Sequence, residues 1–118
     1  MHQYLKFIDV SMFITFFSLR SENLREKEIE ALFKHLISNI GGLCYKFMSF
    51  NKGVPDRVAI IPNKGIYFIE LKKKGGRLSP LQSRTIEDMK SKGANVEVIE
   101  GVEGVYKFLK DLNLYDFR

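Results

Sequence analysis

Two carboxylates and a lysine have the types and spacing needed to do chemistry together. Asp56 follows Pro55, and Glu70 precedes Lys72 by two positions. Alternate side chains of a strand share a face, so Glu70 and Lys72 are expected to point the same way. Mg²⁺ prefers carboxylate oxygens, waters and phosphate oxygens. If the two acids lie on adjacent strands, the sequence predicts a hard-cation site with an activated water nearby, to which the Leu71 carbonyl could add an oxygen.

A surface ion pair between Glu70 and Lys72 beside Asp56 is the alternative interpretation, because charged pairs are common on strands. Two observations count against it. Ile66 and Phe68 share the face of Glu70, so that face is apolar further along the strand. The two acids also lie within a strongly basic stretch of the chain.

The charge of the chain is concentrated in its middle third. The 118 residues have a formal net charge of +5. Residues 46–77 contain eight Lys and Arg but only the acids Asp56 and Glu70, which gives +6 there against −1 for the rest. A basic surface of this kind suits a polyanionic partner. Each of these side chains taken singly could equally be a solvated surface residue.

Two further polar residues allow both a structural and a functional interpretation. Asn23 can cap a helix with Glu26 as its capping-box partner, yet Glu26 also lies on the apolar stripe of that helix. Glu30 lies near the edge of the same stripe. Ser79 and Gln82 form a second capping box, and Gln82 could instead contact an attacking water or a phosphate.

The elements that must position these residues follow from hydrophobic periodicity and turn residues. Helices are predicted at 23–40, 79–92 and 102–112, and strands at 43–50, 57–61, 66–72 and 95–99. The second and third strands should form a hairpin, and the third and fourth a parallel pair joined by the middle helix. The sequence therefore predicts a single-domain α/β fold, a mixed sheet flanked by helices in the order α-β-β-β-α-β-α.

The first 22 residues differ from the rest and are assigned as an apolar extension of the domain at 23–118. Residues 7–19 are largely apolar but too short to span a bilayer, and Asp9 interrupts them. An extra strand or helix that covers the core or a partner subunit is the favoured interpretation. A targeting segment, a membrane-associated segment and a translation start at or after Met12 are the alternatives.

Other chemistries fit the sequence poorly. His2 and His35 have no cysteine cluster with which to bind zinc. Cys44 is the single cysteine and is expected to be a packed thiol in a reducing compartment. Gly75 and Gly76 follow a strand but lack the rest of a nucleotide-binding loop.

Five stretches together resemble the VRR-NUC branch of the PD-(D/E)XK nuclease superfamily. They are REKEIEALFKHL (25–36), GGLCYKFMS (41–49), GVPDRVAIIP (53–62), YFIELKKKGGRLSPLQ (67–82) and GANVEVI (93–99). The ordered combination of a helix Glu, GVPDR, ELK and LSPLQ is far more specific than a PD…ExK pattern alone. The resemblance implies a restriction-endonuclease-like core and metal-dependent hydrolysis of DNA phosphodiesters.

The resemblance also implies roles for individual residues. Asp56 and Glu70 match the Mg²⁺ or Mn²⁺ ligands, and Lys72 matches the residue that orients or activates water. Glu26, rather than Glu30, matches the carboxylate of the first helix, and Gln82 matches the glutamine after the motif. The residues expected to hold the DNA backbone are Lys52, Arg57, Lys73, Lys74 and Arg77.

Stand-alone members of this branch resemble Holliday-junction resolvases and act as homodimers, largely in phages and bacteria. The resemblance thus implies a structure-selective DNA endonuclease, a homodimer on branched DNA, in the cytoplasm of a bacterial or phage-infected cell and not at a membrane. A non-catalytic DNA-binding module that keeps the fold as a scaffold is the alternative.

Overall fold

Four strands form one mixed sheet in the computed structural model, which describes residues 24–114. They are β1 (Leu43–Lys46), β2 (Arg57–Ile61), β3 (Gly65–Lys72) and β4 (Val96–Glu100), in the spatial order β1-β2-β3-β4. β1 and β3 both pair antiparallel with β2, and β4 pairs parallel with β3. The predicted hairpin and the predicted parallel pair are therefore confirmed.

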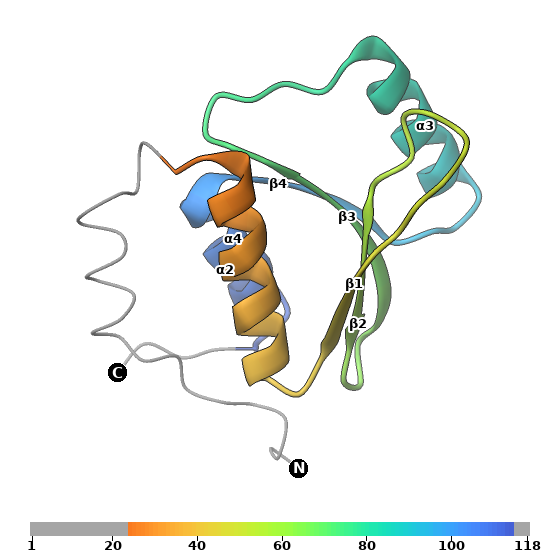
Figure 1. The fold of residues 1–118 in the computed structure, drawn as a ribbon. Helices are drawn as coiled ribbons and strands as arrows, with labels where there is room; N and C mark the ends of the chain where they lie inside the picture. Colours follow the sequence, from red (N-terminus) through yellow and green to blue (C-terminus); the bar gives the residue numbers. More distant parts are fainter. Residues whose placement is uncertain (1–23, 115–118) are drawn as a thin grey trace.

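Three helices accompany the sheet in the described part of the chain. α2 (Glu26–Asn39) and α4 (Gly101–Asp111) lie side by side against one face, and α3 (Pro80–Ser91) lies on the other side, near one end of the sheet (Figure 1). α3 connects β3 to β4, as a parallel pair of strands requires. The predicted fold class and order of elements are confirmed.

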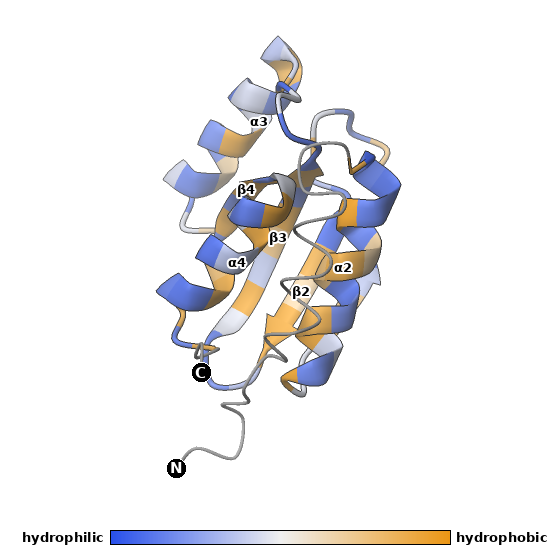
Figure 2. Cartoon of the chain, turned by 90° about the vertical axis from the view of Figure 1, so that its left-hand side faces the viewer, coloured by the Kyte–Doolittle hydropathy of each residue, from blue (hydrophilic) through white to orange (hydrophobic). Residues whose placement is uncertain are grey.

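The core lies between the sheet and the pair α2 and α4. Ala59, Ile69 and Leu71 point from the strands to this side and are buried. They meet the apolar stripes of the helices, including Phe33 of α2 and Leu109 of α4. Figure 2 shows that the apolar residues of both helices face the sheet while their polar residues face outward. Cys44 is buried in the same cluster, as expected for a packed thiol.

The opposite face of the sheet carries exposed apolar side chains where α3 does not cover it. Leu43, Ile60 and Ile66 are direct cross-strand neighbours, so they form a row across β1, β2 and β3. Their exposed fractions range from 37% to 54%. Together with Tyr45 and Val98, which are also exposed on this side, we call them the open sheet face.

The first strand is shorter than the sequence predicts. β1 ends at Lys46, whereas the alternation of apolar and other residues predicted a strand to Phe50. The backbone N–H of Phe47 donates to the Asp56 carbonyl at 2.7 Å, and residues 48–50 beyond it have left the sheet. A run of large apolar residues alone cannot distinguish a paired strand from an exposed loop.

The start of the first helix also differs from the prediction. α2 is capped at Arg25, and Glu28 rather than Glu26 reaches back to the Arg25 backbone N–H at 3.0 Å. Asn23, the predicted cap, lies outside the described residues. The expected capping role of Glu26 is therefore wrong, because the helix begins at Glu26 itself and the third helical position is Glu28.

The apolar extension at residues 1–22 lies outside the described part of the chain. Among residues 24–114, no helix combines the length and the apolar character needed to cross a bilayer.

Candidate functional site

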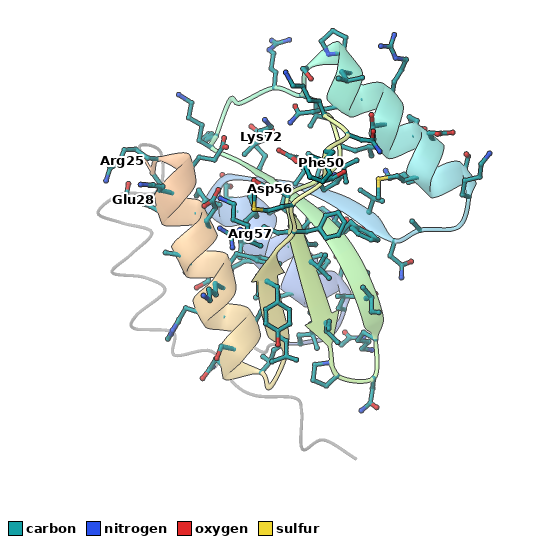
Figure 3. All side chains as sticks on the ribbon, turned by 45° about the vertical axis from the view of Figure 1, so that its right-hand side comes forward. Arg25, Glu28, Phe50, Asp56, Arg57 and Lys72 are labelled. Carbon is teal, nitrogen blue, oxygen red and sulfur yellow. The ribbon has the colours of Figure 1, made fainter. Side chains whose placement is uncertain are left out.

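The β2–β3 hairpin brings the two predicted carboxylates together. Arg57 pairs with Ile69, so Asp56, one residue before Arg57, lies beside Glu70, one residue after Ile69, on the antiparallel neighbour. Burial raises the pKa of Glu70, and the negative charge of Asp56 adds to this rise. Figure 3 shows Asp56 and Lys72 at the end of the sheet between the first turn of α2 and the start of α3. The expected adjacency of the two acids is confirmed.

Glu70 is the centre of this cluster. Only 6% of the residue is exposed, and it is the one charged residue among the buried ones in the described part of the chain. Its Oε2 lies 3.5 Å from the Lys72 Nζ and accepts a hydrogen bond from the Gln82 Nε2 at 3.2 Å. A buried carboxylate held by an ammonium and an amide has a fixed position, unlike a solvated surface ion pair.

The pKa of Glu70 is raised above its ordinary value. Burial is the largest cause, because a charge loses its hydration in the protein interior. The nearby Lys72 ammonium lowers the pKa, whereas the negative charges of Asp56 and Glu26 raise it further. The net direction shows that, in the protein alone, negative charge at Glu70 is insufficiently compensated.

Gln82 has both of the roles that its sequence context allows. The Gln82 Oε1 accepts a hydrogen bond from the Ser79 backbone N–H at 2.9 Å. The Gln82 backbone N–H donates to the Ser79 Oγ at 3.0 Å, which completes the capping box. The side-chain nitrogen of Gln82, Nε2, donates to the Glu70 Oε2. The cap therefore orients the Gln82 amide so that its donor faces the buried carboxylate, and it places the first turn of α3 at the site.

The three acids at the start of α2 have different surroundings. Glu28 caps the helix, and Glu30 binds the Arg57 Nη2 at 2.9 Å across a partly buried ion pair. Glu26 is exposed, yet its charge contributes to the raised pKa of Glu70. Glu30 is therefore engaged by Arg57, and Glu26 as the carboxylate of the site stays a prediction.

The five residues predicted to hold DNA do not share one environment. The Arg57 side chain is only 12% exposed and points toward α2, where it pairs with Glu30 (Figure 3). A DNA contact of Arg57 stays a prediction and would compete with this pair. The other four predicted residues are exposed; they are Lys52, Lys73, Lys74 and Arg77.

The segment after β3 is tied down next to the site. The Gly75 backbone N–H donates to the Glu100 Oε2 at 2.8 Å, and the Lys74 Nζ lies 4.0 Å from the Glu103 Oε1. Gly75 has a φ of +81°, a conformation that favours glycine. These contacts hold the basic segment between β3 and α3 against the start of α4.

Residues 24–114 contain no cluster of three or more His, Cys, Asp or Glu side chains close enough together to hold a metal ion. The donor set still fits Mg²⁺ or Mn²⁺, because Mg²⁺ commonly takes one or two carboxylates and completes its shell with waters and substrate phosphate. The structural observation that fits a cation here is the buried Glu70 carboxylate, which the β2–β3 register places beside Asp56.

The sequence did not single out two features near the site. The capping contact of Glu28 could not be predicted, because Arg25 is not one of the residue types that indicate the start of a helix. Phe50 and Met48 were assigned to a strand, although Ser49, Asn51 and Gly53 around them are turn-forming residues that could have indicated a loop.

Comparison with known proteins identifies the fold and the sequence pattern together. The sequence model of the VRR-NUC domain matches residues 7–103, so the match begins within the segment that we assigned as an extension. "Putative nuclease p44" of Acyrthosiphon pisum secondary endosymbiont phage 1 is 41% identical over 81 residues, which cover 65% of this chain and 84% of the phage protein.

Two solved structures share the architecture. One, a VRR_NUC domain, has a TM-score of 0.67 at 30% identity and covers 72% of this chain and 94% of its own. A VRR_NUC domain protein has a TM-score of 0.60 at 21% identity, with 81% and 94% covered, which shows a shared fold. The buried Glu70 cluster, the fold and these matches lead to one conclusion: the chain belongs to the VRR-NUC family of nuclease domains.

Proposed function

We propose that the chain is a divalent-metal-dependent, structure-selective DNA endonuclease that hydrolyses phosphodiester bonds. The observation that carries this proposal is the buried Glu70, which Lys72 and Gln82 hold in place while Asp56 and Glu26 add negative charge beside it. Such a concentration of carboxylates is destabilising in the protein alone, and a perturbed pKa of this kind is typical of a functional site.

The proposed ligands of a Mg²⁺ or Mn²⁺ ion are Asp56, Glu70 and the Leu71 carbonyl, with Glu26 reaching it directly or through water. A divalent ion at this position would lower the pKa of a bound water and neutralise charge on the phosphate. Burial of Glu70 excludes bulk solvent from one side of the ion. The exposure of Glu26 leaves the other side open to a large substrate.

Lys72 and Gln82 have complementary proposed roles. Both donate to Glu70, which fixes the carboxylate in one orientation. The Lys72 ammonium, 15% exposed, can also orient the attacking water and stabilise the charge that develops on the phosphate. Because Gln82 belongs to the first turn of α3, the amide is held by a helix rather than by a loop.

The surroundings suit a polyanionic substrate. α2 and α3 both begin at the cluster, and the positive end of a helix dipole favours phosphate. Lys52, Lys73, Lys74 and Arg77 are exposed nearby in the chain and are the proposed contacts to the DNA backbone. The phage relative supports a site of action in the cytoplasm of a bacterial or phage-infected cell.

A homodimer on branched DNA is the proposed assembly. Two symmetric cuts in a four-way junction need two sites related by a twofold axis, which a dimer supplies. The open sheet face carries five exposed apolar side chains on adjacent strands, a surface of the kind that marks a subunit contact.

The test is cleavage of labelled four-way junctions, flaps and linear duplexes with Mg²⁺, with Mn²⁺ and with chelator. We expect cleavage only with metal and fastest on a branched substrate. Asp56→Ala and Glu70→Ala should each lower the rate by roughly 100-fold or more, because each removes a charge that the reaction requires. Lys107→Ala, on the outer face of α4, is the matched control and should cleave normally.

Two results would contradict the proposal. Cleavage that Asp56→Ala leaves intact would show that the reaction occurs elsewhere or belongs to a contaminant. DNA binding that survives chelation, with no strand break on any substrate, would favour the non-catalytic DNA-binding module instead.

A further inference from the structure

The connection between β1 and β2 presents two large apolar side chains to solvent. In this segment, residues 47–56, which we call the β1–β2 loop, Phe50 is fully exposed and Met48 is 86% exposed. Lys46 and Lys52 flank the pair in the sequence and are also exposed. Two large apolar side chains exposed in one short loop are candidates for a binding contact.

The loop is held in place at its base and along its side. The Phe47 N–H donates to the Asp56 carbonyl at 2.7 Å, and the Phe47 ring packs edge-on against Phe68 at 5.6 Å. Gly53 has a φ of +92°, and a Cβ there would lie 2.7 Å from the Thr85 Oγ1 of α3. Only glycine permits this close approach, so the loop packs on α3 and holds its tip at a defined position.

The base of the loop is the proposed metal ligand, and its tip is Phe50. A hollow of about 230 Å³ runs along the loop and is lined by Met48, Lys52 and Asp56, among others. Six residues span at most about 20 Å when fully extended, so the Cα atoms of Phe50 and Asp56 lie within about that distance of each other. Figure 3 shows Phe50 on the same side of the molecule as Asp56 and Lys72.

We propose that Phe50, supported by Met48, stacks on an unpaired base at a branch point of the DNA and so selects branched over linear substrates. This inference rests on the proposed function and adds to it the residue that recognises the branch point of the DNA. Stacking on an aromatic ring tolerates any base, because every base has a π-face. In a continuous duplex the ring must first separate stacked bases, whereas at a branch point that cost is already reduced.

The charges around the loop favour DNA over a second protein copy as the partner. Lys46 and Lys52 flank Phe50 in the sequence, and the two cations Lys52 and Arg84 line the neighbouring hollow with one acid, Asp88. Basic residues that alternate with an exposed aromatic are typical of single-strand binding surfaces. Because successive nucleotides of a strand are about 3.4 Å apart, a 20 Å reach places the cut within roughly six nucleotides of the branch.

The experiment measures stacking and selectivity separately. 2-Aminopurine is placed at the branch point of a flap, and binding of Asp56→Ala protein is followed by quenching of its fluorescence. Phe50→Ala in that background should lose the quenching and bind the flap about 5- to 150-fold more weakly. Phe50→Trp should retain both, and Lys107→Ala, on the exposed side of α4, should behave like the parent.

In otherwise wild-type protein, Phe50→Ala should lower the ratio of flap to duplex cleavage, whereas Phe50→Trp and Lys107→Ala should preserve it. Unchanged quenching and an unchanged ratio would overturn the inference while leaving the nuclease proposal intact. A Phe50→Ala protein that sediments as a smaller species than the parent would also overturn it, because Phe50 would then belong to a subunit contact. Quenching without cleavage of any DNA by the wild-type protein would support stacking while contradicting the proposed nuclease.

Discussion

Glu70 is buried beside like charges, and this arrangement opposes the stability of the metal-free protein. Because its pKa is raised in the folded state, the folded protein keeps the proton at pH values where the unfolded chain has released it. Stability is therefore lost as the pH rises from the ordinary value of 4.5 toward the folded pKa, and it stays lost above that range.

Glu70→Gln should consequently be more stable than the wild type at pH 7 in chelator, because a neutral amide needs no compensating charge. The advantage should shrink as the pH falls below 4.5. Urea unfolding across this pH range measures both effects, and Glu97→Gln, at an exposed acid of β4, is the control. A less stable Glu70→Gln protein at pH 7 would show that the attraction of Lys72 outweighs burial and repulsion.

Gln82 allows the helix cap and the site contact to be separated. Ser79→Ala removes the cap acceptor and should lower the free energy of unfolding by about 1 kcal/mol, with little change in the cleavage rate of the folded protein. Gln82→Ala should cost similar stability and also lower the rate by about 10- to 100-fold, because Glu70 loses an orienting donor.

The comparison of the two variants decides between the roles of Gln82. Urea unfolding gives their stabilities, and single-turnover cleavage at saturating metal gives their rates. Equal cleavage rates for Ser79→Ala and Gln82→Ala would show that Gln82 acts only as a capping residue.

At the scale of elements, α2 shows why its acids cannot be assigned from sequence. Glu26, Glu28 and Glu30 lie within two turns, and helical periodicity alone left capping and site roles open. The helix start at Glu26 gives the cap to Glu28, and the Arg57 side chain from β2 takes Glu30. Both outcomes depend on a cap and a tertiary contact that the pattern does not encode.

Local rules predicted much more of the remaining elements. The Ser79-Pro80 start of α3, the β2–β3 hairpin and the parallel pairing of β4 each follow from local spacing and turn residues, and each is observed. The β1–β2 loop was missed because alternating large side chains gave a strand signal as far as Phe50. The adjacency of Asp56 and Glu70 was predictable because the hairpin register fixes it, whereas the contact from Gln82 depends on how α3 docks.

Two of the three acids of α2, Glu26 and Glu30, should respond in opposite ways to truncation. Glu30→Ala leaves the partly buried Arg57 guanidinium without this acceptor and should lower the free energy of unfolding by about 1–3 kcal/mol, with cleavage by the folded protein largely kept. Glu26→Ala should change stability by less than about 0.5 kcal/mol, as an exposed substitution, yet slow cleavage by at least about tenfold.

Thermal unfolding and single-turnover cleavage at low temperature distinguish the two acids. A Glu30→Ala protein that is stable but inactive would show that Glu30, rather than Glu26, is the carboxylate of α2 that acts at the site.

At the scale of the whole molecule, the basic excess of residues 46–77 should appear as salt dependence of DNA binding. Each phosphate contact on duplex DNA contributes about −0.9 to the slope of log K against log salt. Replacing Lys73 and Lys74 together by Ala should therefore make the slope less negative by about 2. The same change of charge at Lys107 and Lys110 of α4 is the control, and an equal effect there would indicate a diffuse rather than a localised contact.

The position of the open sheet face, an apolar surface that the helices leave uncovered, decides what a dimer could do. The row formed by Leu43, Ile60 and Ile66 lies toward the hairpin turn of β2 and β3, whereas Asp56 and Glu70 lie at the other end of these strands. A twofold contact through this row would leave both sites free to bind DNA, one on each protomer.

Substitution of Ile60 and Ile66 together by Lys should therefore convert a dimer to a monomer, because like charges would replace apolar contact at the twofold interface. Sedimentation velocity at micromolar concentration measures this change, and Ala31→Lys on the exposed side of α2 is the control. The monomer should still nick DNA at one site but lose the paired cuts of a junction. Dimers that persist with both lysines would show that the subunits meet on another surface, and a wild-type monomer would rule out symmetric junction cleavage by this assembly.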